Sequence, residues 1–323
     1  TNAITGLLDA WQDNTPVIFI SGQIKRKETS RNSQIGLRQF GVQEADIISI
    51  VESLTKYSVM VNESEDILYH LEKAAHLAVS GRPGPVWIDI PLDVQGFSVD
   101  IHELKRFIPE IEAKQEIKGI EQFVEMYEKS KRPIVLAGNG VRLSGSVDKL
   151  REFVSKNNIP CAVSYLAADY FEQENPNYVG RLGIKGDRAG NFAIQNSDLI
   201  ICLGSRLSVC LTGFEYELFA RESKLIVVDI DKDEHKKNTV NIDQLIHADV
   251  GAFLENIENK ISPNVWGDWQ NKCMHWKNKW PVYQNGYDTN TVNMYEFTRA
   301  LSELANEDQI VVSDAGSSYY VTS

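Results

Sequence analysis

Several features that define other protein classes are scarce or absent in this chain. Its 323 residues include four cysteines, and no two of them form a CxxC pair. A chain of this length needs no disulfide framework, so the cysteine content argues against a disulfide-rich secreted scaffold and fits a reducing cytoplasm. No stretch approaches the ~20 apolar residues of a membrane helix, and no signal peptide opens the sequence. We therefore expect a cytoplasmic protein with no membrane partner.

Positive charge is also in the minority. The 33 Lys and Arg residues face 45 Asp and Glu residues, which gives a net charge of −12. Non-specific attraction to nucleic acid or to an anionic membrane needs a surplus of positive charge. The composition therefore predicts no nucleic-acid partner and favours a small molecule or another protein.

The common catalytic and metal motifs are missing as well. GxSxG, HExxH and GxxxxGK[ST] do not occur, so hydrolase and P-loop hypotheses have no support in the sequence. The six histidines are scattered, and the closest Cys/His pair, Cys273 and His275, offers too few ligands for a zinc site. We predict no metal-ligating residue within this chain.

Short apolar runs that alternate with helical segments are what the sequence does contain. Continuous apolar strands without polar alternation are typical of a parallel sheet covered on both faces by helices. Strands are expected at 17–20, 86–90, 133–137, 161–164, 199–203, 225–229 and 245–248. Helices are expected at 3–12, 45–51, 65–79, 147–157, 188–195, 213–219, 250–260 and 294–304.

The predicted fold class is α/β, with a doubly wound, Rossmann-like central domain. Part of another α/β domain precedes it, and the start of a third follows. The predicted boundaries are 1–95 for the first domain, 96–118 for a linker, 119–262 for the central domain, 263–289 for a second linker and 290–323 for the third. We expect the Trp-rich stretch 266–280 to pack against a domain and not to form a ligand box.

Three groups of residues follow predicted strands of the central domain. Gly138 and Gly140 follow one strand, Arg206 follows another, and Asp229 and Asp231 end a third. Glycines allow backbone N–H groups to approach a phosphate, a guanidinium binds phosphate, and carboxylates accept from ribose hydroxyls. The carboxyl ends of parallel strands form the edge where such sheets bind ligands, which suggests a nucleotide site. The alternative is that the glycines serve only tight turns and helix packing.

The end of the chain carries a second candidate. Ile310, Val311 and Val312 resemble a strand that leads into Asp314-Ala315-Gly316-Ser317-Ser318, a turn suited to a phosphate. The sequence therefore predicts a phosphate contact at this turn.

The order and spacing of longer motifs add a family resemblance. TNAITGLLDAWQDNTPVIFISGQ, RQFGVQEADI with TKYSVMV, GRPGPVWIDIPLDVQ, LAGNGV, DLIICLGSRL, VVDIDKDE and VVSDAGSS cover essentially the whole chain. In this order they resemble the acetolactate synthase branch of the thiamine diphosphate-dependent enzymes. The resemblance implies a pyrimidine-binding domain at 1–95, a nucleotide-binding-like central domain, and the beginning of a diphosphate-binding domain.

The resemblance also implies cofactors and site residues. Thiamine diphosphate with Mg2+ is the expected cofactor pair. Gln43 matches a glutamine that lies near the active site, and Gly316, Ser317 and Ser318 match the turn on the cofactor's diphosphate. The activating glutamate and the magnesium loop of relatives would lie before Thr1 and after the last residue. We therefore expect a fragment of a longer protein, inactive alone, or a chain completed by another polypeptide.

The sequence departs from the family pattern at several positions. Val42 stands where relatives usually have Phe, and Leu92 stands where they often have Lys. The stretch that matches RFDDR keeps Arg206 but lacks the acidic pair and the second arginine, and Ile184-Lys185 replaces a Met-His pair. FAD in the central domain is therefore left open. Lys185 with Arg206 could instead favour a phosphorylated ligand or pair with surface acids.

The resemblance leads to a function hypothesis. The expected reaction is decarboxylation of pyruvate or a similar 2-keto acid to an enamine, followed by transfer to a carbonyl acceptor such as a keto-sugar or an aldehyde. The resemblance also implies a homodimer or homotetramer. The alternative is a non-catalytic nucleotide-binding or oligomerisation module derived from such an enzyme.

Overall fold

The structure, a computed structural model, describes residues 1–110, 116–262, 266–283, 291–306, 308–314 and 316–322. The chain divides into two compact units, Thr1–Gln115 and Glu116–Ser323. The division falls inside the predicted linker 96–118. The two units are called unit 1 and unit 2 below, and each is described by itself.

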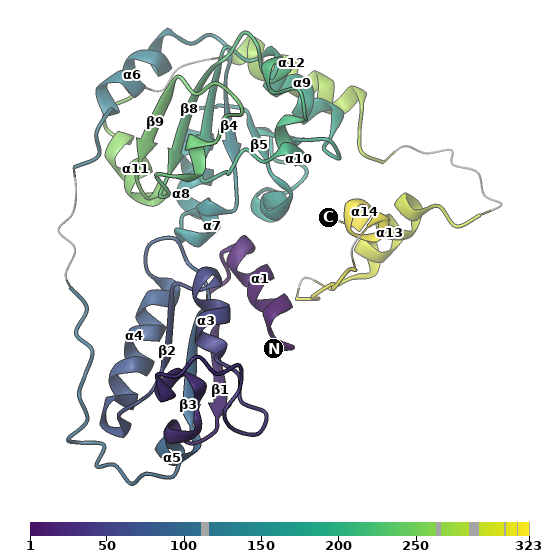
Figure 1. Cartoon of the computed structure of the whole chain (residues 1–323). Helices are drawn as coiled ribbons and strands as arrows, with labels where there is room; N and C mark the ends of the chain where they lie inside the picture. Colours follow the sequence, from purple (N-terminus) through teal and green to yellow (C-terminus); the bar gives the residue numbers. More distant parts are fainter. Residues whose placement is uncertain (111–115, 263–265, 284–290, 307, 315, 323) are drawn as a thin grey trace. The chain divides into compact units, whose positions relative to one another are not determined.

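A three-stranded parallel sheet forms the centre of unit 1 (Figure 1). Its strands are β1 (Ile18–Gln23), β2 (Tyr57–Met60) and β3 (Val86–Pro91), in the order β1-β3-β2. The central strand β3 is buried along nearly its whole length, as its apolar sequence predicts.

Helices cover both faces of this sheet. On one face α1 (Ile4–Asp13) and α3 (Ile47–Val51) pack against Met60 and Trp87. On the other face α4 (Ile67–Val79) and α5 (Leu92–Gln95) pack against Val86 and Ile88. A short helix, α2 (Ser30–Ser33), and 3-10 turns at Arg26–Glu28, Glu52–Leu54 and Ser64–Asp66 occupy the connections.

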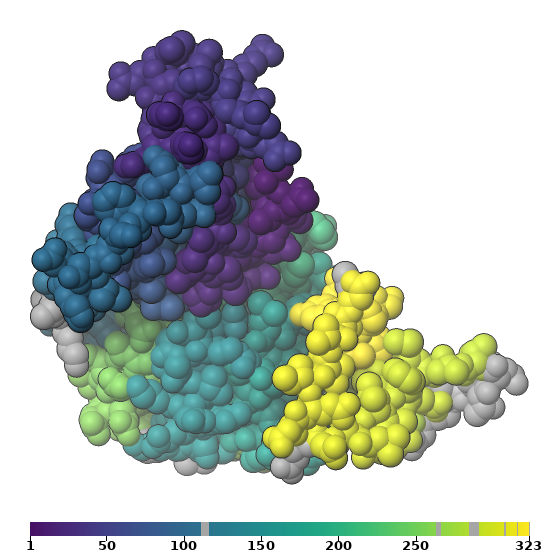
Figure 2. Space-filling view, turned by 90° about the horizontal axis from the view of Figure 1, so that it is seen from below, coloured from purple at the N-terminus to yellow at the C-terminus, as the bar shows by residue number. Residues whose placement is uncertain are grey.

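Residues 96–110 follow α5 without a helix or strand and stay at the surface of unit 1 (Figure 2). Arg106 forms an ion pair with Glu72 of α4 at 2.6 Å, and the Phe107 backbone N–H donates to the same carboxylate. The Phe107 ring meets Tyr69 edge to face. These contacts hold the segment along α4.

Unit 2 contains a six-stranded parallel sheet in the order β6-β5-β4-β7-β8-β9. The strands are β4 (Pro133–Ala137), β5 (Cys161–Val163), β6 (Tyr178–Arg181), β7 (Leu199–Leu203), β8 (Lys224–Asp229) and β9 (Gln244–His247). The chain proceeds outward from β4 to β6, returns to the centre at β7, and proceeds outward again. This is the doubly wound order of a Rossmann fold, with its reversal between β4 and β7.

Two helix layers enclose this sheet. One layer contains α6 (Ile120–Lys129), α8 (Val147–Lys156) and α11 (Val250–Ile257), and the other contains α9 (Arg188–Asn196) and α12 (Gly267–Lys279). Short helices α7 (Gly140–Leu143) and α10 (Val209–Thr212) follow β4 and β7. Further 3-10 turns occupy Tyr165–Tyr170, Tyr216–Leu218 and Glu234–Lys236.

The Trp-rich stretch becomes α12 and joins the core of unit 2. Trp266, Trp269 and Cys273 are buried, and the Trp269 indole N–H donates to the Pro133 carbonyl at 2.9 Å. The buried Lys277 ammonium donates to the Tyr178 carbonyl at 2.8 Å. The predicted packing role of these aromatic residues is confirmed, and residues predicted as a linker contribute to the central core.

The C-terminal part differs from its sequence-based description. Helix α13 (Met294–Leu304) has the predicted bounds, and a short α14 (Ser317–Thr322) follows. The predicted strand at Ile310–Val312 is wrong, because these residues have no strand assignment and their side chains are exposed. A strand exists only when a neighbour satisfies its backbone groups, and no described segment pairs with this one.

Most other predicted elements agree with the structure to within a few residues. Strands β2 and β6 were not predicted, because both are short, lie at sheet edges and contain polar residues or glycine. The helix predicted at 213–219 is also wrong. The chain instead forms α10 before Gly213, whose φ of +80° ends that helix, and a 3-10 turn after it.

Two buried tyrosines offer a matched test of this core. The Tyr170 hydroxyl accepts from the Arg142 N–H at 2.9 Å and donates to the Gly138 carbonyl at 3.1 Å. The Tyr127 hydroxyl is buried without a partner among the described residues. We expect Tyr170→Phe to cost about 1–3 kcal/mol and Tyr127→Phe to be neutral or stabilising. Urea denaturation of both variants checks this, and equal losses would contradict the assigned packing.

Candidate functional site

The predicted glycines lie at the reversal point of the unit 2 sheet, where an open α/β sheet can bind a ligand. Their backbone donors are already used. Gly138 N–H donates to Leu203 O, Gly140 N–H donates to Gly204 O, and Gly204 N–H donates to Val228 O, each at 2.9 Å. The ends of β4, β7 and β8 are thus bonded directly to one another.

The space beside these glycines is filled by protein. A Cβ on Gly138 would lie 2.3 Å from the Gly204 oxygen, and one on Gly140 would lie 2.7 Å from the Gly204 Cα. Such distances would force the strands apart, so glycine is needed for close backbone approach. The arrangement favours the packing alternative for Gly138 and Gly140, and their role in nucleotide binding stays a prediction.

The two aspartates after β8 hold their own loop. The Asp229 carboxylate accepts from Asp231 N–H at 2.9 Å and lies 3.0 Å from His235 Nε2. The Asp231 carboxylate accepts from the N–H groups of Asp233 at 2.7 Å and Glu234 at 3.1 Å. Both carboxylates stabilise the turn from Asp229 to His235.

Arg206 belongs to a charged cluster beside this loop. Its Nε lies 3.1 Å from Glu234, and Lys237 Nζ lies 2.8 Å from the same carboxylate. Burial raises the pKa of Glu234, but hydrogen bonds from Lys237 and Arg206 outweigh it, so the net pKa is lowered. The cluster stabilises the ionised carboxylate. Lys185 is exposed in the turn that follows β6.

These observations together test the fit of FAD to unit 2. A dinucleotide needs open backbone donors for its phosphates and an acceptor for its ribose. Here the strand-end N–H groups bond to carbonyls, the space above the glycines is filled, and the aspartates bond within their loop. The described glycines and aspartates at these strand ends, as arranged, do not fit FAD.

Gln43 lies in an exposed turn between α2 and α3 of unit 1. It adopts φ +60°, in the left-handed region, and its neighbour Val42 is 85% exposed. A non-glycine residue in this region costs roughly 1–2 kcal/mol relative to ordinary backbone. The surrounding structure must therefore hold the turn.

Glu44 stabilises this turn by hydrogen bonds. This residue was not predicted from the sequence as part of the site. Its side chain is buried and accepts from Ser30 N–H at 3.0 Å, Ser30 Oγ at 2.5 Å and Phe40 N–H at 3.0 Å. Burial raises its pKa, but these hydrogen bonds outweigh burial and the net pKa is lowered. An ionised carboxylate therefore links the two sides of the loop.

A second buried carboxylate lies at the end of β3. Asp89 accepts from Ser21 Oγ at 2.6 Å and from Gln23 Nε2 at 3.0 Å. Burial raises the pKa of Asp89 despite these hydrogen bonds. A single acid within the otherwise apolar strand VWIDIP is the one signal of this site in the sequence. It was not recognised because its partners are over 60 residues away.

The C-terminal turn is the third predicted location. Gly316 has φ +88° with open space where a Cβ would stand, and Ser317 begins α14. The Ser318 hydroxyl donates to the Asp314 carbonyl at 2.9 Å. The backbone at Gly316 is thus open, and the contact of Gly316, Ser317 and Ser318 with a diphosphate stays a prediction.

Other features of the described residues do not add a site. No group of three or more His, Cys, Asp or Glu side chains within them could hold a metal ion. None of their helices combines the length and apolar character needed to span a bilayer.

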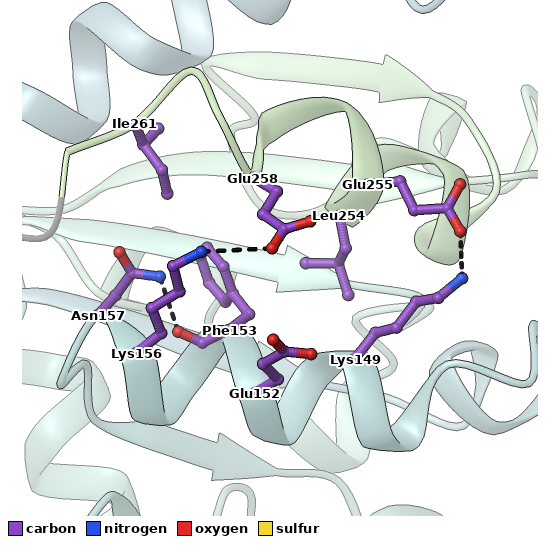
Figure 3. Close-up of a pocket in the computed structure, with 9 residues that line it drawn as sticks. All are labelled: Lys149, Glu152, Phe153, Lys156, Asn157, Leu254, Glu255, Glu258 and Ile261. Atoms are coloured by element: carbon purple, nitrogen blue, oxygen red, sulfur yellow. Dashed lines mark hydrogen bonds and ion pairs between the residues drawn. The ribbon is translucent and has the colours of Figure 1, made fainter.

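A groove of about 300 Å3 lies between α8 and α11 (Figure 3). Its apolar floor includes Phe153, Leu254 and Ile261. Ion pairs from Lys149 to Glu255 and from Lys156 to Glu258 cross it. The groove contains none of the predicted site residues.

The geometry of unit 2 agrees with a family comparison. Residues 120–257 match the model of the thiamine pyrophosphate enzyme central domain. This range covers the doubly wound sheet from α6 to α11. Residues 120–257 therefore form a domain similar to the central domain of the thiamine pyrophosphate enzymes.

Similarity to individual relatives extends beyond that domain. The chain is 31% identical to the acetolactate synthase isozyme 2 large subunit of Escherichia coli over 98% of its own length and 55% of that protein. It is 30% identical to a probable acetolactate synthase large subunit of Methanocaldococcus jannaschii, over 98% of the chain and 54% of the relative. The Lactococcus lactis acetolactate synthase large subunit gives the same three values. The chain spans about half the length of these relatives.

The Glu44 network predicts that the difference in unfolding free energy between the wild type and Glu44→Gln depends on pH. Because folding lowers the pKa of Glu44, its contribution is present above the ordinary Glu value of about 4.3 and is lost as pH falls through the folded pKa. Glu44→Gln should cost about 1–3 kcal/mol at pH 7. The difference from wild type should shrink toward pH 3. Urea titrations from pH 3 to 7 measure it, and a difference independent of pH would contradict an ionised Glu44.

The poor fit of FAD gives another prediction. Added FAD should neither raise the melting temperature of the protein nor lose fluorescence on mixing, because the strand-end donors are occupied. A flavin-binding protein titrated in parallel is the positive control. Saturable quenching of FAD fluorescence would show that the strand-end loops rearrange to admit a nucleotide.

Proposed function

We propose that the protein is a thiamine diphosphate-dependent 2-keto acid decarboxylase or carboligase of the acetolactate synthase type. The observation that carries this proposal is 31% identity to such a subunit over 98% of the chain, including both flanks of the central domain. Similarity in the flanks disfavours the alternative of a non-catalytic module built from the central domain. When bound, thiamine diphosphate supplies the electron sink that lets a 2-keto acid lose carbon dioxide.

Gln43 is the residue of this chain that we propose to contact substrate. Its amide can donate and accept, and the exposed left-handed turn directs residues 42 and 43 away from the buried side of the loop. The neighbouring Glu44 is buried and satisfied by the loop itself. Gln43 is therefore the polar side chain of this turn that is available to a carbonyl group.

Gly316, Ser317 and Ser318 are proposed to contact the diphosphate of the cofactor, with Mg2+ as its counter-ion. Two serine hydroxyls contribute on the order of 0.5–1.5 kcal/mol each, whereas micromolar affinity requires about 8 kcal/mol. The turn is therefore one part of a larger site. We assign no step to Gly138, Gly140, Arg206, Asp229 or Asp231, since their contacts support a structural role.

The donor is proposed to be pyruvate or a similar keto acid. The acceptor is proposed to be a carbonyl compound other than a second keto acid, for example a keto-sugar or an aldehyde. The support is that Val42 and Leu92, at positions where the resembled family usually carries Phe and often Lys, are both exposed. An apolar side chain in place of a cation cannot hold a carboxylate. A homodimer or homotetramer in the cytoplasm completes the proposal.

Carbon dioxide release tests this function. The complete protein with thiamine diphosphate, Mg2+ and pyruvate should release carbon dioxide well above a sample without cofactor. Gln43→Ala should lower kcat by about tenfold to a hundredfold, the range of a lost positioning contact. Gln34→Ala, at an exposed glutamine of the same loop that also has a left-handed backbone (φ +55°), is the matched control. Absence of carbon dioxide release with every keto acid offered would refute the proposed chemistry.

A further inference from the structure

Two hydrogen-bond networks reach the two residues that directly follow Gln43. On one side, Gln23 at the end of β1 donates from Nε2 to the Ala45 carbonyl at 2.9 Å. On the other side, the Glu44 carboxylate bonds to Ser30 and Phe40. Glu44 and Ala45 are the two residues that follow Gln43, so one network holds the Ala45 backbone and the other holds the Glu44 side chain, both directly after Gln43.

The first network is anchored in the sheet. The same Gln23 Nε2 donates to Asp89 at 3.0 Å, and Asp89 also accepts from Ser21 Oγ at 2.6 Å. Ser21 in turn accepts from the Trp87 indole N–H at 2.8 Å. The side-chain oxygen Oε1 of Gln23 accepts from Ile24 N–H at 3.0 Å. Every polar atom of the Gln23 side chain therefore has a partner, so its orientation is fixed.

The strained backbone explains what these networks do. A positive φ in a non-glycine residue persists only when the surrounding structure over-determines it. Here the strain falls on Gln43, and the restraints fall on the next two residues. We propose that Gln23, anchored by Asp89, and Glu44 are positioning residues that hold Gln43 in its exposed left-handed turn. This inference rests on the proposed function only for the contact between Gln43 and substrate.

Buried polar networks of this kind add little to the stability of a fold, because desolvation of the polar groups offsets much of the hydrogen-bond energy. An apolar side chain of similar size would avoid the desolvation of Asp89 and Glu44, which raises the pKa of both before hydrogen bonding is counted. Their value lies in defining one backbone geometry. Removing Gln23 or Glu44 should therefore disorder the Gln43 turn more than it lowers the free energy of unfolding of the whole protein.

Hydrogen exchange tests the restraint without any activity. In the complete protein, Gln23→Met keeps side-chain length but removes the amide, and it should speed exchange of the amides at 39–46 severalfold. The matched control is Gln95→Met, which removes a comparable 2.7 Å bond from a glutamine Nε2 to the Ile90 carbonyl. It should leave 39–46 unchanged. Unchanged exchange at 39–46 in both Gln23→Met and Glu44→Gln would overturn the proposal.

A double-mutant cycle tests the link to catalysis. Gln23→Met should lower kcat by about tenfold with Gln43 present and should have little further effect in Gln43→Ala, because it acts through that side chain. Full additivity of the two losses would overturn the positioning role. If Gln43→Ala alone leaves kcat unchanged, the proposed role of Gln43 fails instead, and hydrogen exchange still decides whether Gln23 restrains the turn.

Discussion

The close approach of β4 and β7 at their carboxyl ends is the constraint on which unit 2 depends. The strand order reverses there, so two chain crossovers leave the sheet in opposite directions. Gly138 and Gly140 from one strand end meet Gly204 from the other with no room for a Cβ. Tyr170 then closes the junction by donating to the Gly138 carbonyl. The place where related folds admit a nucleotide is filled here by backbone.

In unit 1 the carboxyl ends of the strands carry bonded polar side chains instead of closely packed backbone. The carboxyl ends of β1 and β3 bring together Ser21, Gln23 and Asp89, which are polar and mutually bonded. Their donors continue to the Ala45 carbonyl and so reach the Gln43 turn. In unit 2 the ends of β4, β7 and β8 are joined mainly by backbone hydrogen bonds, whereas in unit 1 the Gln23 side chain connects the sheet to the Gln43 loop. The difference favours the strand ends of unit 1, and not those of the unit 2 sheet, as the place that holds a proposed site residue.

The sequence predicted the buried strands well and the site poorly, for a physical reason. Continuous apolar runs such as 133–137 and 199–203 specify strands covered on both faces, and β4 and β7 have those bounds. Edge strands β2 and β6 lack that signal. A run such as Ile310–Val312 has strand composition, but its pairing is a tertiary property that composition does not contain. Glu44 and Gln23 were invisible for the same reason, since their roles depend on partners distant in the chain.

Glu44 and Asp89, the two buried carboxyls near the Gln43 turn, differ in their electrostatics. Both carboxyls are buried, yet hydrogen bonding lowers the pKa of Glu44 while burial keeps that of Asp89 raised. Glu44 accepts from the Ser30 hydroxyl and from two backbone N–H groups, and these three bonds favour the charged form, whereas Asp89 accepts from the Ser21 and Gln23 side chains. The carboxylate whose ionised form is favoured therefore lies directly after Gln43, and the Asp89 network connects the same turn to the sheet through Gln23.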